Sequence, residues 1–155
     1  MAAERSVTFY VRGAPIPQGS VEAHVGRRKD GSRYASVHYR VGTKLHAWRR
    51  AISVAARAEW GDEMTYHPVR LTLVFYMKRP LSHYVGLAGD IKIAYLRVAH
   101  DTVPDLDKLV RAVMDALTEC VYSDDSQVVD VSASKRYVPN ATHPPGVEVT
   151  IHAMP

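Results

Sequence analysis

The stretch that follows Pro104 restricts the possible folds more than any other part of this chain. Its apolar residues recur at helical spacing, and they are Leu106, Leu109, Val110, Val113 and Leu117. The spacing predicts a helix over residues 105–119 with one apolar face. Because such a face is stable only when it packs against another element, the surrounding segments must supply a partner surface.

Those surrounding segments predict both a sheet and a second helix. Residues 69–77 alternate between large apolar side chains and other residues, which is the pattern of a strand. A helix is expected from Thr43, as its N-cap, to about Trp60. Asp30 and Gly31 are a strong signal for the turn of a hairpin. Further strands are expected over residues 7–12, 21–25, 34–39, 128–137 and 147–152.

These elements predict the fold class α+β. We expect a single domain over residues 1–155, with a mixed β-sheet, an N-terminal hairpin and two main α-helices. The segment between Pro80 and the helix after Pro104 has no clear periodicity. A loop of that length is more often functional than accidental.

Composition limits the compartment and the kinds of site. The 155 residues are 46% hydrophobic and 23% charged, as in an ordinary globular domain. The apolar runs are far shorter than the ~20 residues that span a bilayer, and the first residues lack the apolar core of a signal peptide. Cys120 is the only cysteine, which excludes an intrachain disulfide and a cysteine-based zinc site. We expect a cytoplasmic protein with a buried thiol at Cys120.

The basic residues are concentrated in the first third of the chain. Residues 1–50 contain ten Lys and Arg against three acids, whereas residues 51–155 contain ten against thirteen. This split indicates either a polyanion-binding surface beside a region that needs carboxylates, or a solvated basic face without a partner.

Two carboxylates stand at the start of the helix that follows Pro104. Asp105 and Asp107 would lie about 200° apart inside a helix, but Pro104 places them at its start, where both can converge on one point. Asp124-Asp125 lies on the turn that returns the chain to the sheet. We expect that turn near the helix start if the next strand packs antiparallel to the helix. Oxygen ligands of this kind favour Mg²⁺ or Mn²⁺ over zinc.

Purely structural interpretations of the same residues remain open. Asp105 can be an N-cap with Asp107 as a first-turn acid, and the Asp124-Asp125 pair can simply belong to a turn. Asp107, Arg111 and Asp115 can form an ion-pair ladder along one helix face, or Arg111 can face a phosphate. His100 is a possible proton donor, although a surface loop histidine explains it equally well.

Three segments together resemble one family. They are PDLDKLVRA at residues 104–112, YSDDSQVV at 122–129 and KRY at 135–137, with looser similarity in GAPIPQG at 13–19 and KRPLSHY at 78–84. This combination is similar to the RusA family of Holliday junction resolvases, which are common in phages and prophages. The resemblance implies a homodimeric, Mg²⁺-dependent DNA endonuclease, with Mn²⁺ as a possible substitute, acting in the cytoplasm of a bacterial host.

The resemblance also implies roles for individual residues. The essential metal-binding acids of the family fall on Asp105, Asp107 and Asp125, and its catalytic lysine falls on Arg111, a departure that suits phosphate binding better than proton donation. Lys108 or Lys135 could supply the missing ammonium. The implied reaction is attack by metal-activated water, with paired symmetric nicks across a four-way junction and 5′-phosphate products. The implied DNA-binding residues are Arg27, Arg28, Lys29, Arg33, Lys44, Arg49, Arg50, Lys108, Lys135 and Arg136.

Two other functions are compatible with parts of this pattern. The first is a non-catalytic nucleic-acid-binding dimer whose carboxylates are structural, and Arg111 is the departure that suggests it. The second, a small Mn²⁺-dependent sugar-nucleotide transferase, fits poorly because the sequence has no Gly-rich phosphate loop and no nucleotide-binding βαβ unit; we therefore expect no nucleotide cofactor. For a dimer, the candidate surfaces are residues 91–98 and the sheet edges.

Overall fold

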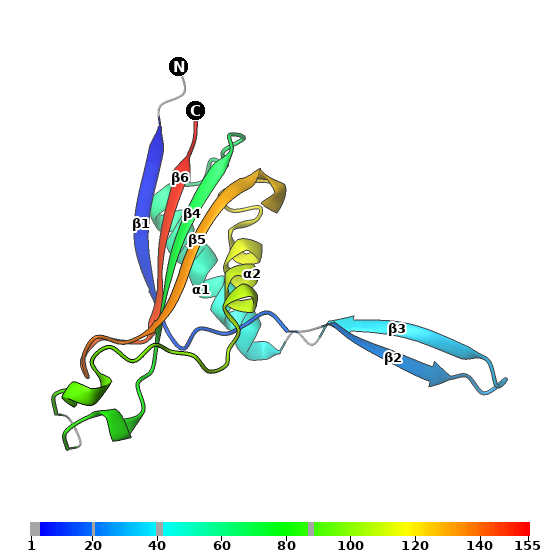
Figure 1. Ribbon diagram of the computed structural model, residues 1–155. Helices are drawn as coiled ribbons and strands as arrows, with labels where there is room; N and C mark the ends of the chain where they lie inside the picture. The colour runs from blue at the N-terminus through cyan, green and yellow to red at the C-terminus, as the bar shows by residue number, and fades with distance from the viewer. Residues whose placement is uncertain (1–3, 20, 40–41, 87–88) are drawn as a thin grey trace.

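A four-stranded sheet forms the centre of the molecule (Figure 1). The computed structural model describes residues 4–19, 21–39, 42–86 and 89–155; residues 1–3, part of the stretch considered for a signal peptide, lie outside it. The strand order is β1-β6-β4-β5, with β4 parallel to β5 and the other pairs antiparallel. The strands are β1 (Arg5–Arg12), β4 (Val69–Met77), β5 (Val128–Tyr137) and β6 (Gly146–Ala153).

Two helices cover one face of this sheet (Figure 1). They are α1 (Thr43–Trp60) and α2 (Leu106–Leu117). The alternating side chains of β4 and β6 point toward them, so Leu73 and Val149 are fully buried together with Ile52 of α1 and Val113 of α2. The predicted α+β class, with its mixed sheet, hairpin and two main helices, is confirmed.

Both helices begin or end differently from the prediction. The N-cap of α1 is Gly42, not Thr43, and its carbonyl accepts the amide of Leu45 at 2.9 Å. Asp105 is the N-cap of α2, in extended conformation, and the helix ends at Leu117 rather than at residue 119. Cys120 is buried just beyond that end, and burial raises the pKa of its thiol.

Two segments lie outside the layered body. The hairpin of β2 (Val21–Arg27) and β3 (Arg33–Tyr39) projects away from it as a two-stranded ribbon (Figure 1). The segment after β4 contains two short 3₁₀ turns, η1 (Leu81–His83) and η2 (Ile93–Tyr95), at the end of the sheet where α2 begins. Within the described residues, no helix combines the length and the apolar character needed to span a bilayer.

Candidate active site

The start of α2 presents two exposed carboxylates, Asp105 and Asp107, which we call the acid pair. Although Asp105 is the N-cap, its side chain caps no backbone amide. It instead accepts a hydrogen bond from the Lys108 ammonium at 2.8 Å, and this contact holds the pKa of Asp105 below its usual range. The charge of Asp107 acts on the same ammonium and helps to raise the pKa of Lys108. Lys108 is therefore bonded to Asp105 and feels Asp107 only through its charge.

Lys135 fixes the chain immediately before the acid pair. Its ammonium, on β5, donates to the carbonyl oxygens of Thr102 at 2.5 Å and Pro104 at 2.8 Å. Its charge also contributes to the lowered pKa of Asp105. On the other side, the amide of Gln18 donates to the carbonyl oxygen of Lys108 at 3.0 Å. The acid pair is thus held by contacts from two distant segments of the chain.

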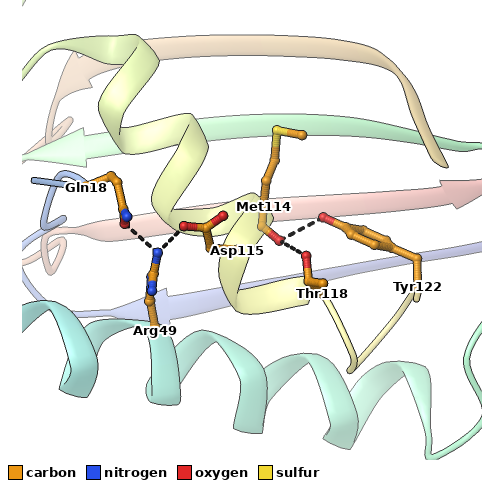
Figure 2. Close-up of polar contacts among 6 residues, drawn as sticks. All are labelled: Gln18, Arg49, Met114, Asp115, Thr118 and Tyr122. Carbon is orange, nitrogen blue, oxygen red and sulfur yellow. Dashed lines mark hydrogen bonds and ion pairs between the residues drawn. The ribbon is translucent and has the colours of Figure 1, made fainter. Parts of the chain in front are cut away.

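Asp115, two turns further along α2, has a different environment (Figure 2). It forms an ion pair with Arg49 of α1, and Arg49 also donates to the side-chain oxygen of Gln18. The predicted ladder through Arg111 is wrong at this step, because Asp115 takes its partner from another helix. Arg111 is exposed and forms no ion pair with any residue that the structure describes.

The end of α2 is fastened through one carbonyl oxygen (Figure 2). The Met114 carbonyl accepts hydrogen bonds from the Tyr122 hydroxyl at 3.0 Å and from the Thr118 hydroxyl at 3.0 Å. Thr118 has left the helical conformation. The helix therefore stops where side chains from the following turn satisfy its last carbonyl oxygens.

The two acids on the following turn, Asp124 and Asp125, have separate roles. Asp124 accepts the amide of Ser126 at 2.8 Å, and Gln127 accepts the amide of Asp124 at 3.3 Å, which together form a capping box for η3 (Asp125–Gln127). Hydrogen bonding from the side chain and the amide of Ser126 lowers the pKa of Asp124. Asp125 is exposed, and among the described residues its carboxylate has no hydrogen-bond partner. The spacing Asp-x-x-Gln was the sequence signal for this cap.

Asp125 does not lie beside the acid pair in one copy of the chain. The acid pair is at the start of α2, and the turn η3, which begins at Asp125, follows the other end of that helix (Figure 1). A helix of 12 residues is about 18 Å long. Burial, together with the charges of Asp125 and Asp115, raises the pKa of Tyr122. Asp125 is therefore close enough to act on Tyr122, which lies just beyond the end of α2.

The expectation that this turn lies near the helix start is therefore wrong within one copy. The turn joins the end of α2 directly to the start of β5, and only the far end of β5, at Lys135, returns to the helix start. In the described part of the chain, no three His, Cys, Asp or Glu residues gather where they could hold a metal ion.

The candidate DNA-binding residues differ in how free they are. The ribbon tip is exposed at Arg27, Arg28, Lys29 and Arg33, as are Lys44 and Arg50 on α1 and Arg136 on β5. Arg49 is the least free of the set, since its guanidinium pairs with Asp115 and donates to Gln18. Lys108 and Lys135 hold the acid pair and its approach.

Two further groups lie beside this site. His100 packs against the Tyr137 ring at 4.7 Å between centroids, and burial together with the nearby Lys135 charge lowers its pKa. Arg79, at the end of β4, is buried and donates to the Tyr95 carbonyl oxygen at 2.8 Å. No role was predicted for Arg79. The burial of Arg79 could have been predicted only by continuing the alternating pattern of β4 two residues past Met77, where the strand ends.

Comparison with known proteins identifies the family. Residues 16–152 match the family described as endodeoxyribonuclease RusA. The chain is also 30% identical over 145 residues to the uncharacterized protein YqaN of Bacillus subtilis (strain 168), covering 94% of each chain. Family membership implies a nuclease with DNA as its substrate and junction resolution as its activity. This chain belongs to the RusA family of endodeoxyribonucleases.

Proposed function

We propose that this protein is a Mg²⁺-dependent, structure-selective endonuclease that resolves four-way DNA junctions by paired symmetric nicks. One observation carries the proposal: the acid pair is exposed, and among the described residues the only group bonded to its carboxylates is the Lys108 ammonium at Asp105. Asp115 and Asp124, in contrast, are used inside the fold. Carboxylates that a fold leaves unused at a helix start are available for a ligand.

The acid pair fits a hard divalent cation. Its donors are all carboxylate oxygens, and the Lys108 ammonium already stands as a cation at Asp105. Asp105 and Asp107 would hold Mg²⁺, or Mn²⁺ in its place. The ion supplies activation of a water nucleophile and stabilisation of charge on the scissile phosphate. The Lys108 ammonium, beside Asp105, would be available to the phosphate.

Arg111 supports binding of the substrate near the acid pair. It follows Asp107 by one helical turn, so the two side chains lie on the same face of α2. Its guanidinium is exposed and offers paired donors that match a phosphate group. An arginine stays protonated at all working pH values, so its role is to hold the phosphate and not to transfer a proton.

The third acid, Asp125, would come from a second copy of the chain. Within one copy it lies at the opposite end of α2 from the acid pair, and β5 spans about 23 Å between Val128 and Lys135. A two-fold homodimer would solve this problem by placing Asp125 of one copy beside the acid pair of the other. Two such sites would then cut the two strands of a symmetric junction.

The edge strand β5 offers a route to that arrangement. Its outer edge carries no neighbouring strand among the described residues, and Val129 and Val131 are 59% and 39% exposed. Antiparallel pairing of β5 with its copy would set the acidic start of one strand beside the Lys135 end of the other. Opposite charges would then meet, and Asp125 would approach the segment that leads to Asp105.

The exposed ribbon of β2 and β3 would contact the DNA outside the cutting site. Its tip has four cations, and the one acid within that tip, Asp30, already accepts the Ser32 amide at 2.9 Å and the Ser32 hydroxyl at 2.7 Å. These contacts would go to phosphates, giving binding that weakens steeply with salt and carries little sequence information.

The direct test is cleavage of a labelled four-way junction with Mg²⁺, with Mn²⁺ and with EDTA, beside a duplex of the same sequence. We expect symmetric nicks with 5′-phosphate ends in either metal, none in EDTA, and little cutting of the duplex. A protein that binds the junction but cuts it in neither metal would instead be the non-catalytic binding dimer.

Mixed dimers test the shared site. Asp107→Asn and Asp125→Asn should each be inactive alone. Because a mixed dimer contains one intact site, mixing them should restore about one quarter of the wild-type sites. The product should be a nicked junction rather than a resolved one. Mixing Asp105→Asn with Asp107→Asn is the matched control and should restore nothing, since both residues belong to the same half of the site. Recovery in the control, or none in the test, would contradict a site shared in this way.

A further inference from the structure

A groove lies between the loop segment 91–99 and the last residues of β5, next to the start of α2. Its volume is about 420 Å³. Four cationic side chains line it, Arg79, Arg97, Lys135 and Arg136, and the described lining contains no carboxylate. We call this feature the cationic groove. A concave surface with one sign of charge concentrates ligands of the opposite charge.

Arg79 is the strongest sign that the groove binds an anion. Its side chain is 5% exposed, and its guanidinium donates to the carbonyl oxygens of Tyr95 at 2.8 Å and Val138 at 3.3 Å, with the Tyr137 ring centroid 5.0 Å away. No carboxylate in the described part of the chain pairs with it. A buried charge normally requires a partner of opposite sign. Here the groove is the side from which one could approach.

The opposite wall adds apolar surface. Leu96 and Val98 are 56% and 40% exposed there, and Ile91 and the Tyr137 ring complete the wall. A duplex presents phosphates and sugars to a protein and hides its base faces within the stack. Cations beside apolar and aromatic side chains fit a nucleotide whose base is unstacked, as in a single strand or at a branch point.

The groove is continuous with the acid pair through one residue. Lys135 lines the groove and also donates to the carbonyl oxygens of Thr102 and Pro104, directly before Asp105. A strand whose phosphate lies at the acid pair would therefore pass Lys135 and enter the groove with its next nucleotide.

We propose that the cationic groove is a subsite for an unpaired nucleotide adjoining the scissile phosphate. Resting on the proposed nuclease function, the assignment names which part of the substrate the site recognises. An enzyme with this subsite selects junctions because a branch point supplies an unstacked nucleotide at low energetic cost, whereas an intact duplex must first be opened.

The test measures binding without cutting. A fluorescein-labelled dT8 oligonucleotide is titrated in EDTA against wild type, Arg97→Ala, Leu96→Ala and, as matched control, Arg70→Ala. Arg70 is an exposed arginine on β4 that pairs with Asp130 at 2.7 Å and lies outside the groove. We expect about 5–10-fold weaker binding for Arg97→Ala and Leu96→Ala, the size of effect typical of one phosphate or stacking interaction. Arg70→Ala should bind like wild type.

The salt dependence and the cleavage assay separate the outcomes. The slope of log affinity against log salt concentration should be smaller in magnitude by about 0.7 in Arg97→Ala, because this variant contacts one phosphate fewer on the single strand. The slope should be unchanged in Leu96→Ala. Equal losses in Arg97→Ala and Arg70→Ala, with none in Leu96→Ala, would overturn the subsite and leave only general charge attraction. Groove-dependent binding in a protein that never cuts would defeat the nuclease proposal and keep the subsite. Normal cutting by all three variants, with unchanged binding of the oligonucleotide, would defeat the subsite and keep the nuclease proposal.

Discussion

The polar groups at the start of α2 and those in the segment from Asp115 to Tyr122 differ in their bonding partners. At the start, Asp105 and Asp107 are exposed, and only Asp105 is bonded, to the Lys108 ammonium, among the described residues. Two turns later, Asp115 is joined to Arg49, and the Tyr122 hydroxyl is bonded to the Met114 carbonyl oxygen (Figure 2). The first arrangement leaves oxygen lone pairs for a ligand, and the second uses polar groups to join α2 to α1 and to the next turn.

The comparison shows that the partner of a carboxylate, more than its position on a helix, indicates its use. A helix N-terminus favours a negative charge only modestly, by about 0.3–1 kcal/mol. That energy does not explain two adjacent exposed acids held in place by Lys135 and Gln18 from elsewhere in the chain. Fixing a segment through contacts from distant parts of the chain costs conformational entropy. Such contacts are expected where the geometry of a site matters for function.

The largest expected effect comes from removing single charges along α2. Asp105→Asn and Asp107→Asn should each lower junction cleavage by about 100-fold or more, the range for loss of a catalytic group. Asp115→Asn should change the rate per folded molecule only a few-fold. The measurement is single-turnover cleavage of a labelled junction in Mg²⁺.

Junction binding in EDTA is the control for these variants. All three should bind as wild type does, because the asparagine side chains keep their shape. If Asp115→Asn loses as much activity as Asp107→Asn while remaining folded, the distinction between the two ends of α2 fails.

The order should reverse when stability is measured. Asp115→Ala leaves the half-buried Arg49 guanidinium without its partner and should lower the free energy of unfolding by about 1–3 kcal/mol, between the values for exposed and buried pairs. Asp107→Ala removes an exposed acid and should change it by about 0.5 kcal/mol or less. Urea unfolding followed by the fluorescence of Trp48 and Trp60 reports both values. A larger loss for Asp107→Ala would contradict the structural account of Asp115.

Local patterns in the sequence predicted the elements, and long-range partners decided what the patterns could not. The apolar stripe of α2 and the alternation of β4 fix which faces are buried, because helix and strand periods determine them. The ladder from Arg111 to Asp115 was predicted from spacing alone. Asp115 instead pairs with Arg49, 66 residues away in sequence, and no local pattern carries that information.

The same limit explains the site. The motif correctly placed Asp105 and Asp107 together, since they are two residues apart at a helix start. Their relation to Asp125 depends on which end of β5 meets the start of α2, and it is the far end, at Lys135, because the turn with Asp125 joins the end of α2 directly to the start of β5. A shared site in a dimer depends further on a second copy, whose position no single-chain pattern encodes.

The smallest change in cleavage is expected at Tyr122, where the comparison can be sharpened most. Tyr122→Phe removes only the hydrogen bond to the Met114 carbonyl oxygen, and Thr118 still donates to the same oxygen at 3.0 Å. The acceptor therefore stays satisfied, and we expect a loss of about 0.5–1.5 kcal/mol in the free energy of unfolding. Cleavage should be unchanged, because the acid pair is remote and the turn that carries Asp125 keeps its own capping box of Asp124 and Gln127. Thr118→Val is the matched variant, since it removes the other side-chain donor. If either substitution slowed cleavage without loss of stability, the position of Asp125 would depend on the turn that Tyr122 anchors, and the capping box of η3 would not be enough to hold it.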